Sequence, residues 1–250
     1  MSIFRLGCWL IAAATSLTVI AGAGVTGTTA AAPCKTGAPV SGNLSVAVVD
    51  MSTGATGQCA PADHKFATAS TVKVDILAAL LLKAQEEGRE LTAVEQANAE
   101  KVIKVSDNAA ATYLWNEIGG TDGLAKANQQ LGLVETAPDT AWGVTTTTAS
   151  DQIRLLKAIT TRHSPLTPEN RAYAHDLMTQ VEADQAWGVS AAADPGSTTA
   201  LKNGWLPRSA TGLWVVNTIG EVQHDGHRLL MAVVSDDQES MEAGVGRRAE

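Results

Sequence analysis

The sequence has few cysteines and few basic residues. Its 250 residues include three cysteines, and 26 aspartates and glutamates outnumber 18 lysines and arginines, which leaves a net charge of −8. So few cysteines cannot build a zinc site of their own, and an acidic chain repels nucleic acid. The sequence also contains no internal repeat and no low-complexity domain. We therefore expect no metal, no cofactor and no nucleic-acid partner.

Residues 1–31 have the pattern of a cleavable signal peptide. Arg5 supplies a positive start, an apolar run continues through Ile20, and the small residues that follow offer a cleavage site. A transmembrane anchor is the alternative, but the glycine-rich end of the run favours cleavage. Neither Cys8 nor Cys34 follows the leucine-plus-small-residue pattern of a lipid-modified cysteine. We expect a secreted, extracellular protein without a membrane anchor, and its remaining length suffices for one large core or two subdomains.

Cys34 and Cys59 are the cysteines that remain after signal cleavage. In an oxidising compartment they are expected to form one disulfide that ties the N-terminal strand segment to its neighbour. Two free, buried thiols are the alternative.

Hydrophobic periodicity predicts an α+β fold. A strand is expected over 42–50, with a return strand from Gln58, and later strands over 198–205, 213–220 and 227–235. Between them, helices are expected over 71–85, 92–103, 106–118, 123–130, 149–160 and 168–182, and a final helix begins near Gln238. This order predicts one antiparallel sheet, built from both ends of the chain, with an inserted all-α subdomain.

Ser70 and Lys73 lie three residues apart at the start of the helix expected over 71–85. Residues at this spacing lie side by side on a helix, and a hydroxyl becomes a nucleophile when a neighbouring base takes its proton. The helix is apolar on all sides and therefore buried, and a desolvated lysine makes a usable base. A chance occurrence, with Ser70 only capping the helix, is the alternative.

Two more segments follow in a meaningful order: Ser106-Asp-Asn108 at a helix start and Lys202-Asn-Gly204 in a late strand. Ser-x-x-Lys, Ser-Asp-Asn and Lys-(Thr or Ser)-Gly are the ordered motifs of class A β-lactamases and penicillin-binding proteins. The chain resembles this family over nearly all of its mature length. The resemblance implies a β-lactamase-like catalytic domain over 36–250, with an α/β part (36–69 and 178–250) and a helical part (70–177).

The resemblance also implies a role for each matched residue. Ser70 would attack the carbonyl carbon, Lys73 would take or relay its proton, and Ser106 would protonate the departing nitrogen. Asn108 would bind Lys73 or the substrate amide, and Lys202 would attract the substrate carboxylate. The other implied binding residues are Asn203, Gly204 and Trp205, with the backbone N–H groups of Ser70 and Trp205 forming the oxyanion hole.

Each of these roles has a simpler alternative. Ser106 is a natural helix N-cap. Lys202 suits a solvated position on a strand, and Gly204 suits a β-bulge, although a strand glycine also marks the close approach of another backbone.

Three departures from the family pattern bear on function. Asn203 replaces threonine or serine, and an amide cannot relay a proton as a hydroxyl can. Only 36 residues separate Ser70 from Ser106, which predicts an open cleft that admits larger ligands such as peptidoglycan stems. The loop before the four threonines Thr145–Thr148 lacks the Glu-x-x-Leu-Asn pattern, whose glutamate activates the deacylating water in the family. Glu135 and Asp139 are the candidate bases, with solvated loop acids as the alternative, and a missing base costs about 10²–10⁴ in rate.

Other residues are assigned from their surroundings in the sequence. His224 and His227 flank an expected hairpin turn, where a surface role is favoured over a metal site. Trp187 and Trp205 are expected to line the cleft. Trp115, Trp142 and Trp214 are expected in the core.

The sequence therefore predicts a monomeric, secreted serine hydrolase that opens β-lactams through an acyl-serine intermediate. Its ligand would be a small-molecule β-lactam or a cell-wall peptide. Three alternatives remain: a slowly deacylating penicillin-binding protein, D-alanyl peptidase or esterase; a β-lactam-binding module without turnover; and a structural cell-wall protein that keeps the fold.

Overall fold

A five-stranded antiparallel sheet joins the two ends of the chain in a computed structural model, which describes residues 42–60 and 64–245. The strand order is β2-β1-β7-β6-β5. The N-terminal strands β1 (Asn43–Asp50) and β2 (Thr56–Cys59) pair beside the C-terminal strand β7 (His227–Asp236). The strands β6 (Trp214–His224) and β5 (Ala200–Pro207) complete the sheet, so β5 forms one edge.

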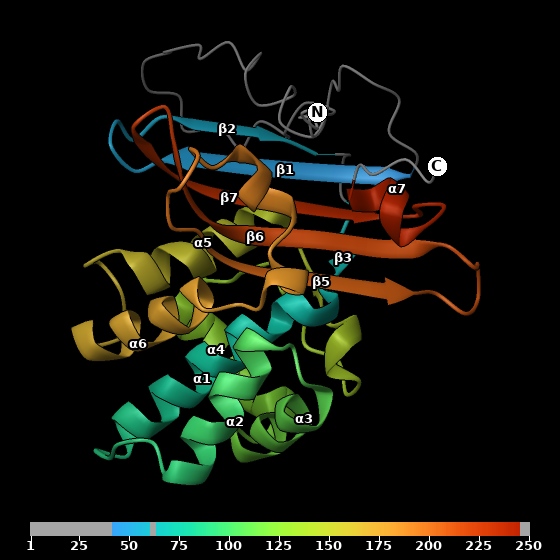
Figure 1. Cartoon of the computed structure of the whole chain (residues 1–250). Coiled ribbons are helices and arrows are strands. Elements are labelled where there is room, and N and C mark those ends of the chain that lie inside the picture. The colour runs from blue at the N-terminus through green and yellow to red at the C-terminus, as the bar shows by residue number, and fades with distance from the viewer. Residues whose placement is uncertain (1–41, 61–63, 246–250) are drawn as a thin grey trace.

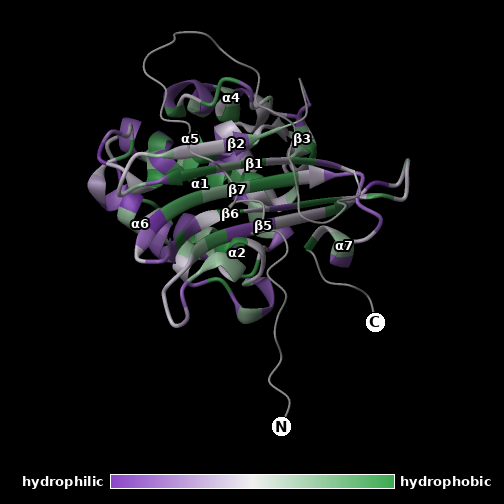
Figure 2. Ribbon diagram, turned by 90° about the horizontal axis from the view of Figure 1, so that it is seen from above, coloured by the Kyte–Doolittle hydropathy of each residue, from purple (hydrophilic) through white to green (hydrophobic). Residues whose placement is uncertain are grey.

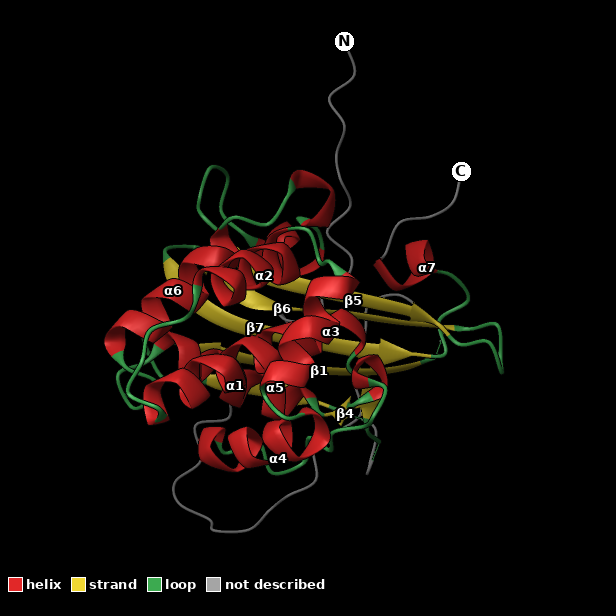
Figure 3. Cartoon of the chain, turned by 90° about the horizontal axis from the view of Figure 1, so that it is seen from below, coloured by secondary structure: helices red, strands yellow, loops and turns green. Residues whose placement is uncertain are grey.

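Most of the helices lie on one side of this sheet, below it in Figure 1 and in front of it in Figure 3. They are α1 (Val72–Glu86), α2 (Ala93–Lys104), α3 (Asn108–Glu117), α4 (Gly120–Leu131), α5 (Ala149–Thr160) and α6 (Pro168–Thr179). A short last helix, α7 (Met241–Val245), contacts β6. The predicted α+β class and the sheet built from both chain ends are confirmed.

The observed elements match the expected ranges to within a few residues at most ends, but some short elements were not predicted. The two-residue strands β3 (Phe66–Ala67) and β4 (Thr146–Thr147) pair with each other. Short 3₁₀ turns cover Ala69–Thr71, Trp142–Val144, Ala183–Gln185 and Gly188–Ala192. The helices α5 and α6 contact the sheet directly, and one continuous core cluster holds residues from the sheet and from all six long helices. The division of the catalytic domain into two parts stays an expectation.

Helix α1 lies at the centre of this core. Its apolar side chains are buried all around it, as expected for a helix that lacks a polar face. Figure 2 shows the same hydrophobic colouring along the middle strands of the sheet. Two ionisable residues in the first turns of α1, Lys73 and Asp75, are also buried, at 0 % and 1 % exposure. Burial, reinforced by the charge of Asp151, raises the pKa of Asp75 well above its ordinary value.

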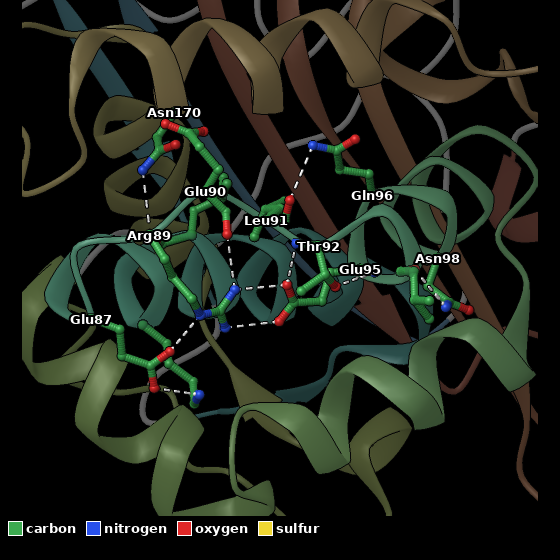
Figure 4. A network of polar contacts seen from close by, with 12 residues as sticks. Glu87, Arg89, Glu90, Leu91, Thr92, Glu95, Gln96, Asn98 and Asn170 are labelled. Carbon is green, nitrogen blue, oxygen red and sulfur yellow. Dashed lines mark hydrogen bonds and ion pairs between the residues drawn. The ribbon is translucent and has the colours of Figure 1, made fainter.

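A polar network fixes the turn between α1 and α2 (Figure 4). The guanidinium of Arg89 donates to both carboxylate oxygens of Glu95, at 2.8 and 2.9 Å. Glu95 also accepts from the backbone N–H of Thr92, while the Thr92 hydroxyl accepts from the N–H of Glu95, which is a capping box. Hydrogen bonding to Arg89 is the main reason that the pKa of Glu95 falls to about 2. The network sets the start of α2, and α2 leads directly to Ser106.

Asn217, in the middle of β6, ties the sheet to the segment that precedes Ser70. Its amide nitrogen donates to the carbonyl oxygens of Ala67 and Thr68, at 2.8 and 3.0 Å, and its oxygen accepts from the N–H of Ser235 at 3.0 Å. The side chain is 1 % exposed, so water cannot replace these bonds. Asn217 therefore fixes the backbone of the nucleophile segment against the sheet.

We expect Asn217→Ala to destabilise the fold. The substitution removes three buried hydrogen bonds, although the Thr68 carbonyl still accepts from the Thr71 hydroxyl, and this loss costs about 1–3 kcal/mol. Urea unfolding measures the change, with Asn98→Ala as control because the Asn98 amide makes an exposed bond within α2. Equal unfolding midpoints for Asn217→Ala and Asn98→Ala would show that the tie carries no stability.

The predicted signal peptide and Cys34 lie outside the described residues. Cys59 is disulfide-bonded, and its pairing with Cys34 stays a prediction. In the described part of the chain, no helix has both the length and the apolar character needed to cross a membrane.

Candidate active site

Ser70 lies in a 3₁₀ turn (Ala69–Thr71) that runs into α1, and it is half-buried. The residue before it, Ala69, has φ 47°, in the left-handed region that a residue with a Cβ rarely adopts. Such strain persists only where surrounding contacts enforce it. Here the Thr71 hydroxyl donates to the Thr68 carbonyl at 2.8 Å, and the Thr68 N–H donates to the Thr145 carbonyl at 2.8 Å. The serine is thus presented on a rigid turn at the start of a buried helix.

Lys73, one turn further on, has no exposed surface and directs its amine toward the start of α3. Its Nζ donates to Ser106 O at 2.5 Å, to Ser106 Oγ at 3.1 Å and to Asn108 Oδ1 at 2.7 Å. Of the two roles predicted for Asn108, the structure therefore places it against Lys73. None of the hydrogen bonds of Lys73 within the described ranges goes to Ser70 or to a carboxylate.

Ser106 lies between two lysines. Its Oγ is 3.1 Å from Lys73 Nζ and 2.9 Å from Lys202 Nζ, and the residue has φ 56°. The helix N-cap is Asp107, whose carboxylate accepts from the Ala110 N–H at 2.7 Å. Ser106 therefore does not cap the helix, and the alternative role suggested by the sequence does not hold. Its hydroxyl is free to connect the two amines.

Burial lowers the pKa of both lysines. Desolvation brings Lys73 to about 8, although the nearby charge of Asp107 acts in the opposite direction. Desolvation and the neighbouring charge of Lys73 bring Lys202 to about 7. Lys202 is 1 % exposed and donates to its neighbour's carbonyl, Asn203 O, at 2.8 Å, so it is not a solvated strand lysine. Near neutral pH the pair therefore exists partly as neutral amine.

Gly204 lets strand β5 approach the nucleophile turn closely. A Cβ at this position would lie 2.6 Å from Ser70 N and 2.7 Å from Thr71 N, which is too close for any side chain. Gly204 continues the regular pairing with β6, opposite Asn217, and is not a bulge. The next residue along β5 is Trp205, whose N–H belongs to the predicted oxyanion hole. That hole stays a prediction.

The side chain of Asn203 makes contacts different from those that its motif suggested. Its amide nitrogen donates to the carbonyl oxygens of Gln185 and Trp187, at 2.7 and 2.9 Å, and the side chain is 1 % exposed. These bonds occupy both of its donors, so the geometry makes Asn203 a residue that positions the segment 185–187. Its direct contact with substrate stays a prediction that these bonds do not favour.

The candidate deacylation bases make hydrogen bonds away from Lys73 and Ser106. Glu135 accepts from the Thr148 hydroxyl at 3.0 Å, at the start of α5, and Arg154 lies 4.0 Å away. Asp139 accepts from the Ala141 N–H at 2.8 Å within its own loop. Neither carboxylate is a hydrogen-bond partner of Lys73 or Ser106 in the described residues, so the geometry favours the alternative of loop acids for both.

Trp142 is the residue that the sequence analysis missed. Expected in the core, it packs against the core cluster but is only partly buried, and its ring centroid lies 5.2 Å from Lys73 Nζ. Its indole N–H donates to the Thr112 hydroxyl at 3.3 Å. The one available signal was its place in the loop where the family carries its glutamate.

The remaining aromatic and histidine residues are placed as follows. Trp115 is buried in the core at 7 % exposure, as expected, whereas Trp214 is only partly buried. Trp187 and Trp205 contact each other with ring centroids 5.7 Å apart, and Trp187 lines a cavity of about 100 Å³ whose lining includes none of the proposed catalytic residues, so the place of both tryptophans in the cleft stays a prediction. His224 and His227 bind separate partners, Ala192 O and Asp50 Oδ2.

The structure thus brings the three motifs together. Ser70, Lys73, Ser106 and Lys202 meet where α1, the start of α3 and the edge strand β5 converge. Two amines of lowered pKa joined by the Ser106 hydroxyl, with Lys73 three residues after the half-buried Ser70, are suited to nucleophilic attack coupled to proton transfer.

Solved structures of similar fold define the class of fold. A variant of the TLA-1 extended-spectrum β-lactamase has a TM-score of 0.72 and 16% identity, covering 82% of this chain and 87% of its own. A class A β-lactamase from Bacteroides cellulosilyticus DSM 14838 has a TM-score of 0.68 and 16% identity, over 81% and 86% of the two chains. One from Mycobacterium abscessus has a TM-score of 0.66 and 22% identity, over 82% and 89%. The fold is that of class A β-lactamases.

Sequence comparison then gives the family. The model described as the beta-lactamase enzyme family matches residues 96–248, so the chain belongs to that family. The matched range contains Ser106 and Lys202 and begins after Ser70 and Lys73. Proteins named "Putative lipoprotein LppW" from Mycobacterium bovis and Mycobacterium tuberculosis are 36% identical over 122 residues, 47% of this chain. The match spans only 38% of the length of these relatives.

We expect stability to rise with pH because of Lys202. Its pKa is about 7 in the folded protein against an ordinary 10.5. Below about pH 7 the amine is charged in both the folded and the unfolded state, so folding must bury an ammonium ion. Between the two values the folded state binds one proton fewer, so the free energy of unfolding rises by up to about 1.4 kcal/mol per pH unit. Lys73, with a pKa of about 8, contributes in the same direction.

Urea unfolding over this pH range tests the expectation. Lys202→Met should be more stable than the original protein at about pH 6 and should lose most of this advantage near pH 10. Lys126→Met is the control, because the Lys126 side chain is 64% exposed. If the free energy of unfolding changed with pH equally in Lys202→Met and in the original protein, other groups would be responsible for the pH dependence.

Proposed function

We propose that this chain is a secreted serine hydrolase that opens β-lactam-type amides by acylating Ser70 and releases the acyl group slowly. The observation that carries the proposal is the chain of contacts from Lys73, three residues after Ser70, through Ser106 to Lys202, with no carboxylate bound to Lys73 in the described residues. Membership of the β-lactamase family supports a hydrolase of this kind.

Acylation begins with neutral Lys73. A neutral amine has two protons and a lone pair, so it gives up one of its three present hydrogen bonds and offers the lone pair to the Ser70 hydroxyl. Ser70 Oγ then bonds to the lactam carbonyl carbon while its proton passes to Lys73. With a pKa of about 8, roughly a tenth of Lys73 is neutral at pH 7.

Ring opening completes the acylation. The lactam C–N bond breaks, and the electron pair stays on the nitrogen, which takes the proton of Ser106. Ser106 recovers a proton from protonated Lys73, 3.1 Å away. Lys73 ends neutral, Ser106 ends as a hydroxyl, and the acyl group is held as an ester of Ser70.

Lys202 supports the reaction by its charge. The chain carries a net charge of −8 and would repel an anionic substrate without a local positive group. Lys202 loses its proton easily when the site is empty, because burial and Lys73 lower its pKa to about 7. A substrate carboxylate next to it favours the ammonium form again, so binding and protonation strengthen each other.

Slow release follows from what surrounds Lys73. Hydrolysis of the ester requires a water molecule and a base, and the carboxylates of the loop, Glu135 and Asp139, are engaged elsewhere. The lack of a carboxylate base costs up to about 10²–10⁴ in rate and leaves Lys73 as the group that can take the water proton. The acyl-enzyme is therefore expected to accumulate.

A D-alanyl peptide of the cell wall is a second candidate substrate. Only residues 105–107 connect α2 to α3, so little chain is available to form a wall on that side of the site. Cleavage would use the same steps, with the peptide nitrogen as the leaving group. Secretion rests on the pattern of residues 1–31, whereas the name of the curated relatives offers lipid anchoring as an alternative.

We expect a penicillin to form a covalent adduct with Ser70. Intact-mass measurement should show the full mass of the penicillin added once, because ring opening loses no atoms, and the adduct should persist well beyond the time of its formation. Ser70→Ala is the control and should show no adduct, while Ser150→Ala changes an exposed hydroxyl contact at the start of α5 and should react normally.

The outcomes separate the alternatives. An unmodified protein that releases opened product quickly would overturn slow release while keeping the hydrolase. Absence of both adduct and product, with penicillins and with D-alanyl peptides and esters alike, would overturn the proposed chemistry.

We expect Lys202→Met to weaken acylation by substrates that carry a carboxylate. A hydrogen bond to a charged group is worth about 1.5–3 kcal/mol, so the loss should be about 10- to 100-fold in kcat/KM. The methyl ester of the same substrate measures the effect without the carboxylate. If Lys202→Met slowed the acid and its methyl ester equally, the assigned role would be wrong.

A further inference from the structure

Trp142 covers the amine of Lys73. The ring centroid lies 5.2 Å from Lys73 Nζ, and the indole N–H reaches across to the Thr112 hydroxyl on α3 at 3.3 Å. The tryptophan therefore spans from its own loop to the helix whose first residues bind Lys73.

The loop that carries Trp142 is fastened to the nucleophile segment. The Thr145 N–H donates to the Trp142 carbonyl at 3.2 Å, and the Thr145 carbonyl accepts from the Thr68 N–H at 2.8 Å. On the other side, Asp139 accepts from the Ala141 N–H at 2.8 Å. The ring position is therefore tied to the turn that presents Ser70.

The ring and the hydrogen bonds together leave Lys73 without exposed surface. Its amine contacts Ser106 O, Ser106 Oγ and Asn108 Oδ1, and the ring lies over it. The charged groups that face it within the described residues are Lys202, through Ser106, and Asp107 at the start of α3. No described carboxylate takes the place that the ring occupies.

We infer that Trp142 is a positioning residue that acts through Lys73: its ring keeps water away from the amine and from the acyl group on Ser70, and so lengthens the life of the acyl-enzyme. This inference rests on the proposed function and explains its slow step. In that step a water oxygen would bond to the ester carbonyl carbon, the bond to Ser70 Oγ would break, and Lys73 would take the water proton and pass one to Ser70.

Two effects of the ring on Lys73 oppose each other. The face of an indole attracts an ammonium ion, which raises a pKa, whereas exclusion of water lowers it. Desolvation is the largest influence on Lys73. Shrinking Trp142 should therefore admit water and raise the pKa of Lys73 toward its ordinary value.

The first test compares adduct lifetimes. A general base with its water is worth about 10²–10⁴ in rate, so Trp142→Ala should shorten the lifetime of the penicillin adduct at least about tenfold, compared at the high-pH plateau of each variant. Trp142→Phe keeps a ring and should stay close to the original protein. Val134→Ala is the matched control, because it shortens a 77%-exposed side chain near the same loop.

The second test does not depend on any substrate. NMR titration of ¹³C-lysine-labelled protein follows Lys73, assigned with Lys73→Arg. Its pKa should rise in Trp142→Ala and stay unchanged in Trp142→Phe and Val134→Ala. Trp142→Leu, which keeps the loop apolar, replaces Trp142→Ala if that variant does not fold.

An unchanged adduct lifetime in the smaller variant would overturn the inference and leave the proposed function intact. If the original protein forms no adduct, the proposed function fails and the titration alone decides. A raised pKa would then support the exclusion of water from Lys73, and an unchanged one would overturn it.

Discussion

Two buried amines share one hydroxyl in this protein, and the rest of the site depends on that arrangement. Ser106 Oγ lies 3.1 Å from Lys73 Nζ and 2.9 Å from Lys202 Nζ, and no described carboxylate is hydrogen-bonded to either amine. Two ammonium ions at such a spacing repel each other in a medium that screens poorly. Repulsion lowers the pKa of Lys202 further, whereas burial alone lowers the pKa of Lys73 to about 8 and so supplies the neutral amine that a serine nucleophile needs.

The fold maintains this costly arrangement by fixing each partner from a different direction. Lys73 comes from a helix buried on all sides, and Lys202 comes from an edge strand that Gly204 allows to approach the nucleophile turn. Ser106 comes from the three-residue connection between α2 and α3. The Arg89–Glu95 pair sets the start of α2, which leads into this connection. Asn217 secures the backbone before Ser70. Because these supports belong to separate elements, the site exists only in the complete fold.

The sequence predicted the elements and the residues that meet, because those depend on periodicity and on ordered motifs. It could not predict contacts that depend on the exact direction of a side chain. Trp142 was expected in the core from its type; it packs at the edge of the core cluster, and its ring also covers Lys73, which the type alone could not predict. Asn203 kept its place in a motif, but its amide faces the carbonyls of a neighbouring segment. Asp107, not Ser106, caps α3, because the left-handed backbone at Ser106 moves the helix start by one residue.

The central claim is that neutral Lys73 activates Ser70, and the pH dependence of Ser70 acylation tests it most directly. At a saturating concentration of a penicillin, whose carboxylate keeps Lys202 protonated, the rate of adduct formation, followed by intact mass at early times, should rise with pH and level off with an apparent pKa near 8, the value that burial gives Lys73. A rate that rises steadily to the ordinary lysine range, or one that does not change with pH, would contradict the account.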